Sequence, residues 1–159
     1  MKIFLQRTID RLDDLAHSLA WLPPLVARLT VGATFVVTGW GKVHNLDNVG
    51  EYFASLHIPA PHAQAVLASF TELGAGLLLV AGLATRLAAL PLIVVMTVAI
   101  ATAKWADIHG AADLIGTLEA TYIAVLLWLA VAGAGSASAD HLLSRLLARR
   151  ARGGESPNP

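Results

Sequence analysis

The chain has 159 residues, of which 56% are hydrophobic, 14% are charged and none is cysteine. Soluble proteins average about 25% charged residues, and a mean hydropathy of +0.64 leaves too little polar surface for a globule in water. These figures exclude collagen, coiled coils, disordered chains and disulfide-stapled scaffolds. A net charge of zero gives no indication of nucleic-acid binding. We therefore predict one all-α membrane domain over residues 1–159.

The absence of cysteine limits the redox chemistry of the chain. Thiol–disulfide relays, iron–sulfur clusters and covalent haem attachment through a C-x-x-C-H motif all require cysteine. Any redox role would depend on a noncovalently bound cofactor or on a partner protein.

Four apolar stretches are candidate transmembrane helices. A hydrocarbon layer about 30 Å thick requires roughly 20 helical residues, and the candidate stretches are residues 22–40, 62–82, 87–103 and 118–133. Because only residues 83–86 join the second and third stretches, we expect these two helices to form an antiparallel hairpin. The predicted fold is an antiparallel four-helix transmembrane bundle that contacts membrane lipids.

The segments that flank this bundle are amphipathic. In residues 1–20 and again near residues 142–147, leucines gather on one helical face and charged residues on the other, which is typical of helices in the headgroup plane. Acidic residues occupy the place of a signal-peptide apolar core, so we expect no cleavable signal. Residues 153–159 are predicted to be disordered.

The distribution of Lys and Arg predicts the orientation. Eight of these residues lie before the first span, between the second and third, or in the tail, and only Lys42 and Lys104 lie on the opposite side. The positive-inside rule then places both termini in the cytoplasm. The expected location is the bacterial inner membrane.

Glu72 lies at the centre of the second span, too deep for its short side chain to reach water. A carboxyl at this depth is costly unless it is paired, protonated or beside water. Its neighbours at three- and four-residue spacing are small, whereas the opposite arc carries large aliphatic residues. Because small residues favour helix contacts, we expect Glu72 to point into the bundle.

The first span offers a partner for this carboxyl. A single helical face carries cations at both ends and glycines between them, namely Arg28, Gly32, Phe35, Gly39 and Lys42. Arg28 lies roughly 9 Å and Glu72 roughly 15 Å from the predicted cytoplasmic ends of their spans, at 1.5 Å per residue. We therefore predict an ion pair or hydrogen bond between Arg28 and Glu72.

Each of these charged residues also has a structural interpretation. A buried Arg–Glu pair can fix helix register without any chemistry. Lys42, beside Trp40, is either an interfacial anchor or a cap for an anionic ligand at the mouth of the bundle.

Polar residues also gather on the outward side. Glu119 and Tyr122 begin the fourth span and are candidates for the wall of a buried polar pocket. Four histidines, accompanied by carboxylates, are weak candidates for metal binding, namely His44, His57, His62 and His109. Their spacing matches no metal-site pattern, so solvated loop residues are the preferred interpretation.

The sequence resembles the DoxX family of small four-helix bacterial membrane proteins. The blocks that carry the resemblance are RLTVG at 28–32, GK at 41–42, YFASLHIP at 52–59, ELGAG at 72–76, GLATRLAAL at 82–90 and GAG at 133–135. Two departures are Ala75 for the family's second glycine and Ala134 for its usual proline. The residues that the family pattern marks here include Arg28, Lys42, Glu72 and Arg86.

The resemblance implies a subunit associated with quinone-linked oxidoreduction, without a catalytic residue set that can be transferred to this chain. One hypothesis is therefore a redox-associated subunit that binds a quinone or a similar lipophilic molecule near Arg28, Lys42 and Glu72, beside a partner redox enzyme. A second is a non-catalytic scaffold or assembly partner of a redox or stress-response enzyme, and this scaffold could also form a homodimer. A third is a proton-coupled transporter, although no repeat or broken helix supports it.

Overall fold

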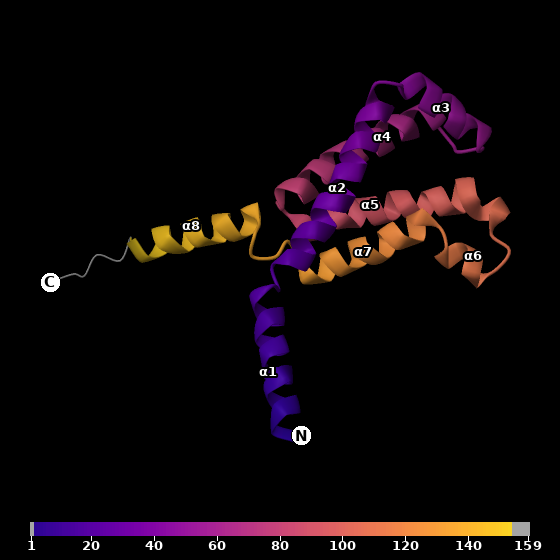
Figure 1. The fold of residues 1–159 in the computed structure, drawn as a ribbon. Helices are drawn as coiled ribbons and strands as arrows, with labels where there is room; N and C mark the ends of the chain where they lie inside the picture. Colours follow the sequence, from indigo (N-terminus) through magenta and orange to yellow (C-terminus); the bar gives the residue numbers. More distant parts are fainter. Residues whose placement is uncertain (1, 154–159) are drawn as a thin grey trace.

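The computed structural model describes residues 2–153, with the side chains of residue 6 and residues 11–146. These residues form helices and turns without a strand (Figure 1), so the all-α prediction is confirmed. In chain order the α-helices are α1 (Lys2–Ser18), α2 (Leu22–Val43), α3 (Leu46–Ser55), α4 (Pro61–Ala81), α5 (Thr85–Ala99), α6 (Ala111–Ile115), α7 (Leu118–Ala132) and α8 (Ala139–Gly153).

Three helical segments are long and apolar enough to cross a membrane: α2, α4 and the stretch Thr85–Asp107. This last stretch is α5 continued by a π-helical turn (Ile100–Lys104) and a 3-10 turn (Trp105–Asp107). The fourth apolar helix, α7, has 15 residues and extends only about 22 Å at 1.5 Å per residue. All four predicted stretches are thus helical, and a fourth full crossing stays a prediction.

The segments between these helices contain two short helices that the sequence analysis did not predict. In α3 the apolar residues Leu46, Val49 and Phe53 are half-buried at helical spacing, and the helix packs against α4. The buried Gly50 allows this contact, because a Cβ there would overlap the His62 ring. The helix α6 follows the 3-10 turn and precedes α7.

The turn between α4 and α5 is short because Gly82 ends α4 in the left-handed conformation, with φ of +67°. The Leu83 amide donates to the carbonyl of Leu78 at 2.9 Å, which closes the last turn of the helix. Ala84 is also left-handed and immediately precedes α5. This geometry places α4 and α5 beside each other.

The helices α2 and α4 pack with their backbones almost in contact. A Cβ on Gly32 would lie 3.0 Å from the Gly76 carbonyl oxygen, and a Cβ on Gly76 would lie 3.0 Å from that of Gly32. Farther along, a Cβ on Gly39 would lie 2.5 Å from the Leu73 amide nitrogen. Residue numbers increase along α2 and decrease along the facing stretch of α4, so the two helices are antiparallel. Glycine is required here because any side chain would separate the helices.

The core lies where α2, α4, α5 and α7 meet. Its buried side chains are mostly aliphatic, with one aromatic ring, and include Val31, Phe35, Leu79, Leu92, Leu126 and Leu129. In Figure 1 the α2–α4 pair and the α5–α7 pair lie close together near the α4–α5 turn and diverge toward α3 and α6.

The terminal helices α1 and α8 extend away from this core in Figure 1. The leucines of α1 whose side chains are described, including Leu12 and Leu15, are exposed, as are Leu142 and Leu143 of α8. An interfacial location for both helices stays a prediction. The predicted disorder of the tail falls mostly on residues 154–159, which lie outside the described residues, as does the side chain of Leu5.

Candidate functional site

Glu72 is buried inside the bundle, as predicted, with an exposed fraction of 1%. Its helix α4 turns a face of small buried residues toward α2, including Ser69 and Gly76. Large aliphatic residues such as Leu67 and Leu77 lie on the exposed side. The pattern of small and large side chains therefore predicted the direction of this carboxyl correctly.

The partners of Glu72 come from the last two turns of α2. The Lys42 Nζ donates to the Oε1 oxygen at 2.5 Å, and the Thr38 hydroxyl donates to the Oε2 oxygen at 3.1 Å. The Lys42 side chain is 34% exposed, so it contacts both the buried carboxylate and the surroundings of the bundle. Both carboxylate oxygens have a donor, which is the condition for an ionised carboxylate to persist away from water.

The predicted pairing of Arg28 with Glu72 is wrong. The Arg28 guanidinium donates instead to the backbone carbonyl of Ala137, in the link between α7 and α8. It also packs against Gly82, where a Cβ would overlap its Nη1 atom.

The error arose from the register of the two helices. The prediction aligned the ends of the two spans, whereas Arg28 lies beside Gly82, the residue that ends α4. Thr38, which binds Glu72, is ten residues after Arg28, or about 15 Å along a helix. The first turns of α2 therefore extend past the end of α4, and Arg28 is too far from the carboxylate.

The candidate pocket residues of α7 lie on its inward side. Tyr122 is half-buried and packs against Phe35 of α2, with the rings tilted at 55° and their centroids 5.6 Å apart. Glu119 is half-buried one turn earlier. Lys42, Glu72, Glu119 and Tyr122 thus lie in the half of the bundle that carries α3 and α6. Thr38 was not predicted from the sequence, although it lies four residues before Lys42 and so shares its helical face.

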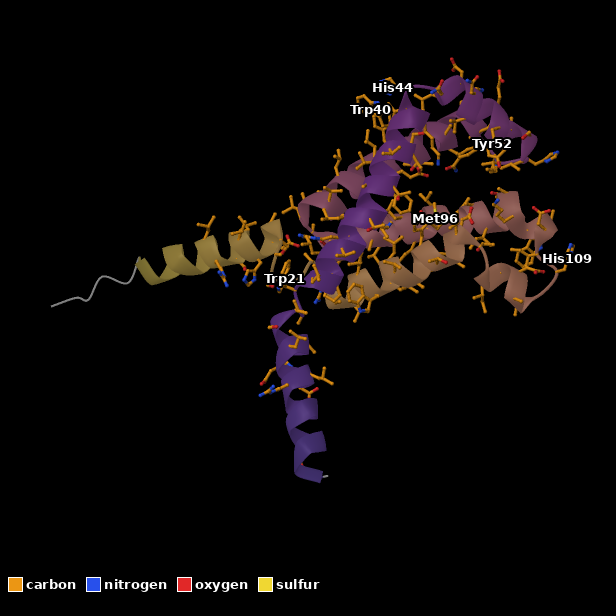
Figure 2. All side chains as sticks on the ribbon, in the orientation of Figure 1. Trp21, Trp40, His44, Tyr52, Met96 and His109 are labelled. Carbon is orange, nitrogen blue, oxygen red and sulfur yellow. The ribbon has the colours of Figure 1, made fainter. Side chains whose placement is uncertain are left out.

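The candidate metal ligands stay apart. Among the described residues, no group of three or more His, Asp or Glu side chains is arranged to hold a metal ion. His44 packs against Trp40 at the end of α2, with the rings tilted at 44° and their centroids 4.4 Å apart. His109 lies near α6, well away from His44 (Figure 2). His57 and His62 are exposed beside α3 and α4.

Arg86 lies at the opposite end of the bundle from Glu72. It is exposed in the first turn of α5, and its guanidinium approaches Gly133, which ends α7 with φ of +81°. The family pattern marked both positions, but only the folded chain brings them together. A polar group nearby, Asp140, was not identified from the sequence: its carboxylate accepts from the Ala84 amide at 3.0 Å.

The comparisons with known proteins cover most of the chain. The sequence model of the DoxX family matches residues 24–105. The inner membrane protein YphA of Escherichia coli strain K12 is 33% identical over 121 residues, which is 73% of this chain and 86% of YphA. The inner membrane protein YqjF of the same strain is 28% identical over 123 residues, or 76% of this chain and 92% of YqjF.

No solved structure matches the chain. The family match includes Arg28, Lys42, Glu72 and Arg86. It therefore covers the Lys42–Glu72 ion pair as well as the two arginines near the α4–α5 turn. The match and the similarity to YphA together show that this chain belongs to the DoxX family.

Proposed function

We propose that the protein is an inner-membrane subunit of a redox system and binds a quinone, or a similar small lipophilic molecule with a carbonyl oxygen, beside Lys42 and Glu72. The observation that carries this proposal is the buried carboxylate of Glu72 held by a partly exposed ammonium. The names of YphA and YqjF as inner membrane proteins support the location.

The donors of Lys42 suit a carbonyl ligand. An ammonium has three N–H donors, and in the described residues one hydrogen bond, to Glu72, is assigned to it. The others are available to an acceptor that approaches from the exposed side. Phe35 and Tyr122 lie deeper along the same interior and offer an aromatic surface to a planar ring.

Glu72 would take up a proton and release it close to that ligand. A quinone accepts two electrons and two protons when it is reduced, and in this proposal the electrons come from a partner redox enzyme. A carboxyl group beside the ligand can take up a proton and pass it to the reduced carbonyl oxygen. Lys42 orients the carboxylate, and Thr38 fixes its second oxygen.

The second candidate function is a non-catalytic scaffold or assembly partner. It is favoured by the same hydrogen bonds, since a carboxylate with a donor on each oxygen is fully satisfied without a ligand. In that case the pair would fix the register of α2 and α4.

The two candidates are distinguished by extracting the protein in mild detergent and measuring bound quinones by mass spectrometry. We expect near-stoichiometric quinone in the native protein, at least tenfold less in Glu72→Gln, and unchanged binding in Glu51→Gln, which removes an exposed carboxylate from α3. Thermal unfolding of each variant shows whether it is folded. Protein without quinone that brings down a single partner would overturn the ligand proposal and support the scaffold.

A further inference from the structure

An open pocket of about 390 Å³ lies at the end of the bundle opposite Glu72. Its walls come from the start of α5, the α7–α8 link and the first turns of α8. The polar side chains that line it are Arg86, Ser138, Asp140, His141 and Ser144. The apolar Leu87 completes one wall.

The charges around this pocket leave one cation uncompensated. In the described part of the chain, the ion pair within 4.0 Å is Lys42–Glu72, so Arg86 has no carboxylate at that distance. One oxygen of Asp140, which lines the same pocket, accepts from the Ala84 amide, and this carboxylate also attracts the buried Arg28 electrostatically. The positive charge of Arg86 is therefore free to bind an anion that enters the pocket.

The same junction holds buried polar atoms without a partner. Among the described side chains these atoms are Arg28 Nε and Nη1, Thr85 Oγ1 and His141 Nε2. Arg28 and Thr85 are buried, and His141 lines the pocket itself. Buried polar atoms in proteins almost always have hydrogen-bond partners.

The surroundings of the pocket are those of a membrane surface. Leu87, Leu90 and Val94 recur at helical spacing on α5 and are 71%, 52% and 61% exposed. This apolar ridge begins in the pocket wall and continues along the membrane-spanning helix. An acyl chain could lie along the ridge while its headgroup contacts Arg86.

We propose that this pocket binds a phosphate group, with the exposed Arg86 guanidinium donating to the phosphate oxygens. The adjoining apolar ridge makes an anionic phospholipid the favoured source of that phosphate. A small soluble phosphate compound offers the same chemistry without the acyl chain. This site is separate from Lys42 and Glu72, so the proposal does not depend on the proposed function.

The test is native mass spectrometry of the full chain in detergent with added phosphatidylglycerol, compared with phosphatidylcholine of the same acyl chains. We expect phosphatidylglycerol to be retained, and Arg86→Gln to weaken its retention about tenfold, as expected for loss of one charged, bidentate contact. Arg86→Lys should lie between the two. Arg145→Gln is the matched control, because it removes an exposed arginine from α8 outside the pocket.

A thermal-shift titration with sodium phosphate, against sodium chloride of equal ionic strength, distinguishes the sources. Stabilisation by phosphate alone that is lost in Arg86→Gln supports the site with a soluble ligand. Phosphatidylglycerol retention without a phosphate effect supports the lipid. Three results would overturn the proposal: neither probe binds, both lipids bind equally while phosphate has no effect, or Arg86→Gln and Arg145→Gln weaken binding to the same extent.

Discussion

The two cations on the buried face of α2 have very different surroundings. Lys42 donates to a carboxylate of the neighbouring helix at 2.5 Å, and both oxygens of that carboxylate have donors. Arg28 donates to a backbone carbonyl of the α7–α8 link, and two of its guanidinium nitrogens have no partner among the described residues. The hydrogen bonds of Lys42 therefore arise within the α2–α4 contact, whereas that of Arg28 depends on a link distant in the sequence.

This difference separates two kinds of buried charge. The Lys42–Glu72 pair is local to the α2–α4 contact and needs no other element. The Arg28 junction joins α2, the α4–α5 turn and the start of α8, since Asp140 binds the Ala84 amide and its own amide donates to the Gly82 carbonyl at 3.1 Å. We expect the first to control the stability of the helix pair and the second to control the attachment of α8.

The largest effect is expected for Lys42→Met. This change leaves the Glu72 carboxylate buried without its cation, and breaking a buried pair in this way costs about 3 kcal/mol when one partner is partly exposed. Unfolding in mixed detergent measures the loss. In the double variant Lys42→Met with Glu72→Gln no buried charge remains, so most of the stability should return. If the double variant is as unstable as the single one, the pair does not account for the loss.

The next effect is expected for Gly39→Ala. Its Cβ would lie 2.5 Å from the Leu73 amide nitrogen, so α2 and α4 must separate, at a cost of about 1–3 kcal/mol. Gly41→Ala is the control, because nothing lies within 4 Å of its Cβ position and alanine favours a helix. The same unfolding assay compares the two. Equal stability of both variants would contradict the close approach of the helices.

The smallest effect is expected for Asp140→Ala. The variant loses the hydrogen bond to the Ala84 amide, which is worth about 1 kcal/mol. It also removes the negative charge that attracts Arg28. Hydrogen exchange should increase in α8 and in the α4–α5 turn while α2 and α4 stay protected. Asp107→Ala, which removes an exposed carboxylate, should change neither region. Faster exchange throughout the bundle would show that the junction is not local.

Much of the fold was predictable from residue types alone. The apolar stretches marked the helices, two of these stretches finished at the residues that end α4 and α7, and the small residues around Glu72 predicted that it points inward. These features depend on helical periodicity and on local backbone preference, which neighbouring residues determine. The helix α3 was missed because a short segment with polar residues resembles a loop unless its apolar spacing is counted.

Which buried charges meet depends on how the helices pack against one another. The sequence placed Arg28, Lys42 and Glu72 on inward faces, but two inward faces can pair at several offsets along their length. The offset is determined by where backbone can approach backbone, at Gly32 beside Gly76 and Gly39 beside Leu73. At that offset Glu72 lies beside Lys42, and Arg28 lies beside the α7–α8 link. The position of this link depends on how the whole chain packs.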